Sequence, residues 1–121
     1  MQKKDICERT FKLALRIVKL CQYLEEQDSG VGKTLGKQLL RSGTSIGANV
    51  EEAQAAQSKA DFVNKLNIAL KEARETDYWL RLLLASDMIS EARLQDLKAE
   101  TEEVTGIIGA IIANTKSTKN P

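Results

Sequence analysis

A run of small residues from Arg41 to Gln57, RSGTSIGANVEEAQAAQ, constrains the fold of this chain more than any other segment. Apolar residues such as Ile46 and Val50 recur through it at helical spacing. Glycine at Gly43 and Gly47 costs about 1 kcal/mol each relative to alanine inside a helix. We therefore expect a helix whose backbone lies very close to a neighbouring helix, which offsets this cost.

The composition favours helices over strands. The chain has 121 residues, its one proline is the last residue, and only five residues are aromatic. Leu, Ala, Glu and Lys, which are good helix formers, are abundant. Hydrophobic residues make up 42% of the chain, which is enough for one modest core. We expect a single domain over residues 1–121.

Apolar periodicity divides the chain into four helices joined by short turns. Ser58 and Asp61 form a predicted capping box at the start of the third helix, and Ser90 is the predicted N-cap of the fourth. The expected helices cover residues 6–26, 33–57, 59–86 and 90–114, and residues 115–121 are expected to form a disordered tail. Such short turns predict an all-α fold, an up-down-up-down antiparallel four-helix bundle.

The first helix carries an apolar arc that is wider than one face of a bundle needs. On a helical wheel the arc spans roughly 220° and ends at Phe11 and Leu15, while basic residues occupy the remaining side. An apolar strip left exposed beside a basic one predicts contact with another subunit. We therefore expect the protein to be a homo-oligomer.

No segment of the sequence predicts membrane insertion or export. The longest apolar run, around residues 107–113, is far shorter than the roughly 20 residues that span a bilayer. Cys7 and Cys21 lie about 21 Å apart along one predicted helix, too far for a disulfide within it. We predict that both are buried thiols in a reducing compartment, and that the protein is cytoplasmic with no membrane partner.

The hairpin of the second and third helices predicts which residues face one another. Arg41 and Glu75 lie equally far, 17 residues, before and after Ser58. We therefore expect Arg41 to meet Glu75 or its neighbour Glu72. Two asparagines, each nine residues from the same turn, predict an amide layer that fixes the register of the helices. The complete predicted polar layer consists of Arg41, Asn49, Asn67, Glu72 and Glu75.

Two patterns resemble enzymatic sites, and neither fits. Gly30–Thr34 ends like a phosphate-binding P-loop, but Gln27 stands where the first glycine belongs and a helix precedes it, so an ordinary glycine turn is favoured. Carboxylates on the middle helices lack the Glu-x-x-His motif of dimetal bundles, because the chain contains no histidine. A serine or cysteine nucleophile lacks its usual base for the same reason. We expect no catalytic residue, metal site, cofactor or small-molecule substrate, and therefore no enzyme.

Basic residues are concentrated in the first third of the chain. Residues 1–41 carry nine Lys and Arg against five Asp and Glu, although the net charge of the whole chain is +1. These basic residues recur every three or four positions on the first two helices, so they form stripes that could contact successive phosphates of a nucleic acid. The alternative interpretation is that each stripe is an ordinary solvated helix face. The candidate nucleic-acid-binding residues are Arg9, Lys12, Arg16, Lys19, Lys33, Lys37 and Arg41.

The segment Ser45–Ala53, SIGANVEEA, followed by Asp61–Phe62 and Glu72–Thr76, resembles a known family. This family comprises bacterial four-helix bundle proteins encoded in intervening sequences of 23S ribosomal RNA genes, and the likeness spans about residues 11–112. Ala53 stands where the family more often has glycine. The resemblance implies an up-down bundle that assembles into a homopentamer. A related branch, the accessory variability proteins of diversity-generating retroelements, binds RNA and a reverse transcriptase through a basic pentamer surface.

Two functions are compatible with these observations. The first is a non-enzymatic homo-oligomer that binds nucleic acid, with structured RNA or a nucleic-acid-processing protein as its partner. The alternative is an oligomeric scaffold for protein–protein interaction without nucleic-acid affinity. The net charge of only +1 favours this alternative.

Overall fold

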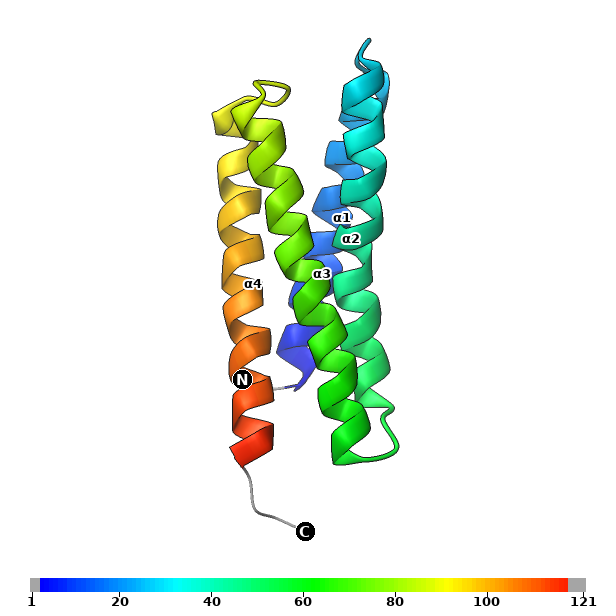
Figure 1. Ribbon diagram of the computed structural model, residues 1–121, viewed down its shortest axis with the longest axis vertical. Helices are drawn as coiled ribbons and strands as arrows, with labels where there is room; N and C mark the ends of the chain where they lie inside the picture. The colour runs from blue at the N-terminus through cyan, green and yellow to red at the C-terminus, as the bar shows by residue number, and fades with distance from the viewer. Residues whose placement is uncertain (1–2, 118–121) are drawn as a thin grey trace.

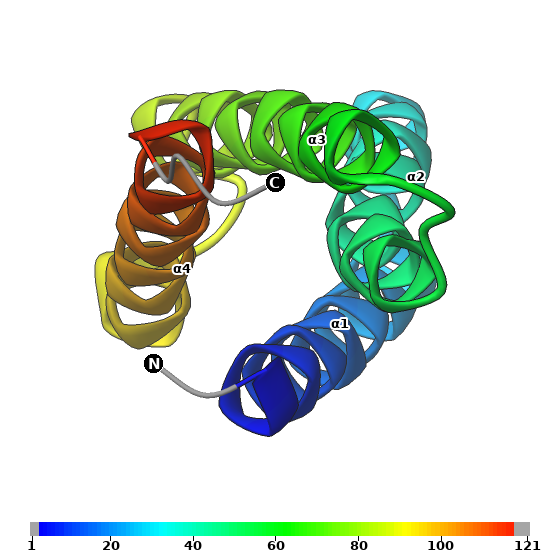
Figure 2. The same cartoon turned by 90° about the horizontal axis from the view of Figure 1, so that it is seen from below.

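The computed structural model describes residues 3–117. Over that range the chain folds into four helices that run alternately up and down (Figure 1). The helices are α1 (Lys3–Glu26), α2 (Gly30–Gln54), α3 (Lys59–Ala85) and α4 (Glu91–Ser117). Each helix packs against the next, and α4 returns to α1 in the least extensive of the four contacts (Figure 2). The predicted all-α antiparallel bundle is confirmed.

Helix α2 begins three residues before the predicted residue 33, because Ser29 caps it. The Ser29 hydroxyl oxygen accepts a hydrogen bond from the Gly32 amide at 3.0 Å. The P-loop-like segment Gly30–Thr34 is therefore the first helical turn rather than a glycine turn, and the Gly32 N–H already has a partner. At its other end α2 stops at Gln54, three residues before the predicted residue 57.

The outer ends of α1 and α4 extend further than expected. Helix α1 begins at Lys3 rather than residue 6. Helix α4 continues to Ser117, so residues 115–117 of the predicted tail are helical, and residues 118–121 lie outside the described residues. Within the described part, no helix has the length and apolar character needed to cross a membrane.

The predicted cap of α3 is present with one change of partner. The Ser58 hydroxyl accepts a hydrogen bond from the Asp61 amide at 3.0 Å. The Asp61 carboxylate accepts one from the Gln57 amide at 3.2 Å, one residue earlier than a standard capping box places it. This bond, helped by Lys65, lowers the pKa of Asp61. Ser90 caps α4 as predicted, accepting from the Arg93 amide at 3.3 Å.

The core is filled by aliphatic side chains from all four helices. Its largest fully buried members are Ile6, Leu13, Ile17, Leu24, Leu39, Ile46, Val50, Leu66, Leu80, Leu83, Leu94 and Ile108. The predicted close approach of α2 to a neighbour occurs against α1. A Cβ added to Gly47 would lie 3.2 Å from the backbone carbonyl oxygen of Thr10, closer than most Cβ contacts. The glycines of α2 thus let two helix backbones come together.

The polar layer between α2 and α3 is found in part. Arg41 contacts both Glu72 and Glu75, as the spacing from the turn predicts. The amide layer does not form, because Asn49 donates to the Ser45 carbonyl of its own helix at 2.8 Å and Asn67 is exposed. A buried hydroxyl pair lies in the core instead, with Ser42 Oγ and Thr76 Oγ1 2.9 Å apart.

Candidate nucleic-acid interface

The seven predicted nucleic-acid-binding residues do not form one continuous surface, and Arg9 is already paired. Its guanidinium donates to Glu100 at 2.8 Å and to Glu103 at 3.0 Å, which ties α1 to α4. The hydrogen bonds from Glu100 and then Glu103 raise the pKa of Arg9, and its side chain is 28% exposed. A phosphate would have to displace both carboxylates to bind this guanidinium.

Arg41 is held in a similar way on the opposite side of the bundle. Its guanidinium donates to Glu72 at 3.2 Å and to Glu75. The Trp79 indole N–H also donates to Glu75, at 3.0 Å. Trp79 therefore takes part in the contact between α2 and α3, and Arg41 serves this contact as well.

Three of the predicted residues, Lys12, Arg16 and Lys19, remain exposed along α1, and we call them the α1 basic strip. The side chain of Lys12 is 71% exposed, and its one ion pair among the described residues is a 3.5 Å contact with Glu8. Such exposed pairs contribute little and exchange readily with other partners. The α1 basic strip is thus accessible to phosphate groups.

Part of the α1 basic strip borders a hollow of about 210 Å³ between α1 and α4. The residues that line it are Arg16, Lys19, Leu20, Arg93 and Leu97. The lining contains three cations and no carboxylate, although α4 has more acidic than basic residues. The Arg93 guanidinium lies 4.0 Å above the centre of the Tyr23 ring, which holds it at the edge of α1. This hollow presents positive charge suited to an anionic ligand.

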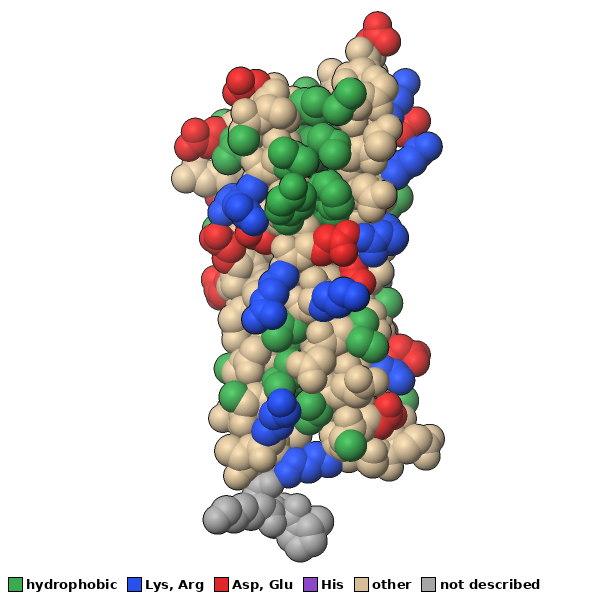
Figure 3. All heavy atoms as spheres, viewed as in Figure 1, with side chains coloured by type: hydrophobic (Ala, Val, Ile, Leu, Met, Phe, Trp, Pro, Cys, Tyr) green, Lys and Arg blue, Asp and Glu red, His purple; other side chains and the backbone are tan. Residues whose placement is uncertain are grey.

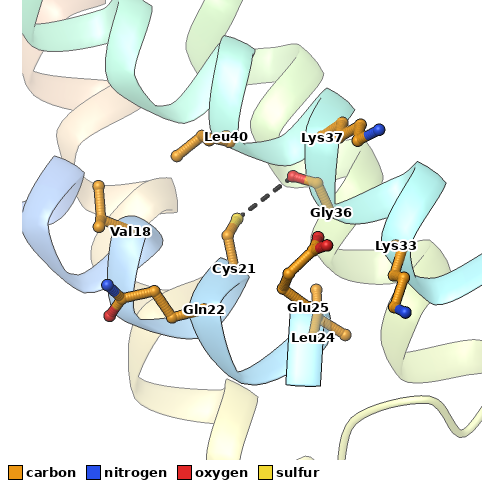
Figure 4. Close-up of a pocket in the computed structure, with 9 residues that line it drawn as sticks. All are labelled: Val18, Cys21, Gln22, Leu24, Glu25, Lys33, Gly36, Lys37 and Leu40. Atoms are coloured by element: carbon orange, nitrogen blue, oxygen red, sulfur yellow. Dashed lines mark hydrogen bonds between the residues drawn. The ribbon is translucent and has the colours of Figure 1, made fainter. Parts of the chain in front are cut away.

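The remaining predicted pair, Lys33 and Lys37, belongs to α2 and lies on the side of α1 that faces α2. These residues line a second hollow of about 210 Å³ between α1 and α2, whose floor is formed by Val18, Cys21 and Leu40 (Figure 4). Glu25 also lines this hollow, so its charge is mixed. The two predicted stripes are therefore separate surfaces rather than one.

An exposed apolar strip runs along the outside of α1 and α2 between these two sets of cations. Phe11 is 62% exposed, Leu15 47% and Leu40 39%. We call these three residues the apolar strip. Its exposure agrees with the wide apolar arc predicted for the first helix, which α2 covers only in part.

Cys7 and Cys21 are half-buried rather than fully buried as predicted. The Cys21 thiol donates to the Gly36 carbonyl oxygen at 3.3 Å, an interaction drawn in Figure 4. Burial raises the pKa of Cys21 to about 11, because a thiolate would lose its hydration there. Cys21 is therefore a packing residue with low reactivity at neutral pH.

Sequence reasoning missed basic residues at two places, Arg93 on α4 and a pair on α3. Arg93 was missed because it stands in an acidic part of the chain, where residues 87–121 carry four basic and six acidic residues. The second group lies on the outer side of α3, where Lys71 and Arg74 are exposed. Charge counting by segment finds neither group, because it ignores which carboxylates are paired across the bundle.

These features define a class of protein, an all-α bundle with charged outer surfaces. Among the described residues, no three His, Cys, Asp or Glu side chains are grouped closely enough to hold a metal ion. The sequence pattern of the 23S rRNA-intervening sequence protein family matches residues 2–110. The chain therefore belongs to the 23S rRNA-intervening sequence protein family.

A solved structure supports this assignment. The chain is similar to a protein of unknown function from the S23 ribosomal protein family of Bacteroides thetaiotaomicron, known from a crystal structure. The two share 46% sequence identity, and the match covers 88% of this chain and 97% of that one, with a TM-score of 0.82. A comparison with curated proteins gives no match.

Proposed function

We propose that this protein is a non-enzymatic homo-oligomer that binds structured RNA through the α1 basic strip and Arg93. The observation that carries the proposal is the hollow between α1 and α4, where Arg16, Lys19 and Arg93 meet without a lining carboxylate. Cations grouped in this way neutralise phosphates and release their counterions on binding. The family resemblance supports the same function, because a related branch of the family, the accessory variability proteins, binds RNA.

Self-association is the second part of the proposal, with a homopentamer as the assembly that the family resemblance implies. The apolar strip supports it, because Phe11, Leu15 and Leu40 expose apolar side chains that water solvates poorly. Assembly into a ring repeats the α1 basic strip once per subunit. Several weak phosphate contacts then act together and raise the apparent affinity.

Charge reversal tests the RNA surface. We expect the triple variant Lys12→Glu, Arg16→Glu, Lys19→Glu to lose most affinity for a structured RNA hairpin in a fluorescence-anisotropy titration. The matched control, Lys12→Arg, Arg16→Lys, Lys19→Arg, keeps the charge and should keep most of the affinity. Equal hairpin affinity in the wild type and the charge-reversed variant would contradict the assigned surface.

The alternative function is an oligomeric scaffold that binds a protein and no nucleic acid. The ion pairing of Arg9 and Arg41 favours it, because these pairs remove two cations from the predicted basic stripes. A wild-type protein that forms an oligomer but binds no RNA at low salt would support the scaffold. The same result would exclude the RNA-binding function.

A further inference from the structure

The outward face of α3 carries a regular stripe of polar, basic and aromatic residues. Its members are Asn64, Asn67, Lys71, Arg74, Tyr78 and Arg81, which we call the α3 face. They are spaced alternately three and four residues apart, so they share one side of the helix, and all six are exposed. In Figure 3, where α3 lies in front, basic side chains descend over this side of the molecule below an apolar cluster.

The carboxylates of α3 near this stripe are engaged in ion pairs. Glu72 and Glu75 bind Arg41 of α2. Asp77 binds Arg81 at 3.1 Å and lies 3.8 Å from Lys98 of α4. Among the described residues, neither Lys71 nor Arg74 forms an ion pair. The centre of the α3 face therefore carries two cations without an ion pair in the described part of the chain, although Asp77 and Glu102 line the hollow beside Arg74 and are paired with Arg81 and Lys98.

Tyr78 gives the α3 face an exposed aromatic ring in a defined position. Its ring is held against Trp79 in an edge contact, with centroids 5.2 Å apart and planes inclined at 73°. The Arg81 guanidinium lies 5.7 Å from the ring centre. The side chain is nevertheless 49% exposed. An exposed ring beside a guanidinium group is suited to stacking against an unpaired base.

The lower end of the α3 face opens into a shallow hollow of about 580 Å³ between α3 and α4. Lys59, Asn64, Asn67 and Lys116 line it together with Ala60 and Val63. From Asn64 to Arg81 the stripe is about 26 Å long, at 1.5 Å per residue. This length matches roughly eight stacked nucleotides at about 3.4 Å per step. Asparagine amides at one end can pair with base edges that a duplex would hide.

We infer that the α3 face binds an unpaired stretch of RNA, with Tyr78 stacking on a base and Lys71 and Arg74 contacting phosphates. This inference rests on the proposed RNA-binding function. It adds that the α3 face is a second binding surface, which is specific for unpaired RNA. Helix α3 lies diagonally across the bundle from α1 (Figure 2), so each surface can be altered without touching the other. Unpaired nucleotides and paired segments of one RNA thus have separate contacts.

The test uses the full chain, a 12-nucleotide single-stranded RNA and a blunt RNA hairpin in anisotropy titrations. The hairpin is closed by a four-nucleotide loop, which is too short to follow the α3 face. We expect Tyr78→Ala to weaken single-strand binding about tenfold or more and to leave hairpin binding unchanged. The control Tyr78→Phe keeps the ring and should bind as the wild type does. Lys71→Ala with Arg74→Ala should lower the salt slope of single-strand binding by about two. Circular dichroism establishes that each exposed variant is folded.

Each outcome separates this inference from the proposed function. Wild-type binding of both RNAs with no effect of the α3 variants would overturn the inference and leave the function in place. No RNA binding by the wild type would overturn both. Poly-glutamate is titrated as a comparison polyanion. If the Tyr78→Ala and Lys71→Ala/Arg74→Ala variants lose affinity for poly-glutamate as strongly as for single-stranded RNA, the α3 face binds an acidic protein segment, and the inference is overturned. Loss of hairpin binding only in α1 variants, and of single-strand binding only in α3 variants, is the expected result.

Discussion

Gly43 of α2 lies directly against Ile17 of α1, so closely that a Cβ at Gly43 would be 2.7 Å from Ile17 Cγ2 and 2.9 Å from Cγ1. Both residues are buried at the middle of the contact between the two helices. Real Cβ atoms essentially never come within 3.0 Å of such atoms, and Ile17 is itself fully enclosed. The α1–α2 spacing therefore depends on the absence of a side chain at Gly43.

We expect Gly43→Ala to destabilise the protein although alanine is the better helix former. Overpacking of a core costs about 1–3 kcal/mol, and the propensity gain of about 1 kcal/mol offsets only part of it. Gly106→Ala on α4 is the matched control, because nothing lies within 4 Å of its added Cβ. Urea unfolding should show a lower midpoint for Gly43→Ala and an unchanged or higher one for Gly106→Ala. A stabilised Gly43→Ala protein would contradict this packing.

The clamp formed by Arg9 with Glu100 and Glu103 should matter because α1 and α4 share the least extensive contact in the bundle. We expect Arg9→Ala to destabilise the protein by about 1 kcal/mol, less at high salt. Arg9→Lys should restore only part of the loss, because an ammonium does not span both carboxylates in the same geometry. Thermal unfolding at two salt concentrations measures this. If Arg9→Ala and the wild type have the same unfolding temperature at both salt concentrations, the clamp contributes nothing to stability.

Cys21 should react slowly in the folded protein, because burial raises its pKa to about 11. At pH 8 we expect iodoacetamide to label Cys21 about tenfold more slowly in the folded than in the urea-unfolded protein. Peptide mass spectrometry separates it from Cys7. The unfolded thiol ionises at lower pH than the folded one, so this contribution to stability is present below pH 9 and is lost as the pH rises towards 11. Equal labelling rates would show that Cys21 is not shielded.

The fold could be predicted because its signals are local. Helical periodicity, the serine caps and the short turns all favour one antiparallel bundle, and the glycines of α2 predicted the close helix contact. Counting from the turn gave the correct level for Arg41 opposite Glu75. It failed for the asparagines, because distance from a turn fixes a level along the bundle but not a direction around each helix. Asn49 bonds to its own helix, while the adjacent face buries Ser42 against Thr76.

The candidate site could be predicted only in part, because charge on a helical wheel does not reveal which neighbour it meets. Arg9 fits a basic stripe in the sequence, yet its partners on α4 lie more than 90 residues away. The α3 face is hidden for the opposite reason. Basic and acidic residues are nearly balanced along α3, and the face emerges only once its carboxylates are paired with Arg41, Arg81 and Lys98.

The central claim is that this bundle assembles and binds RNA through phosphate contacts. Its most direct test combines the light-scattering mass of the wild-type protein with anisotropy titrations of a structured RNA across a salt series. We expect a mass several times that of one 13.4 kDa chain, and an affinity whose logarithm falls linearly as the logarithm of salt rises. A monomer, or an oligomer with no salt-sensitive binding at low ionic strength, would contradict this account.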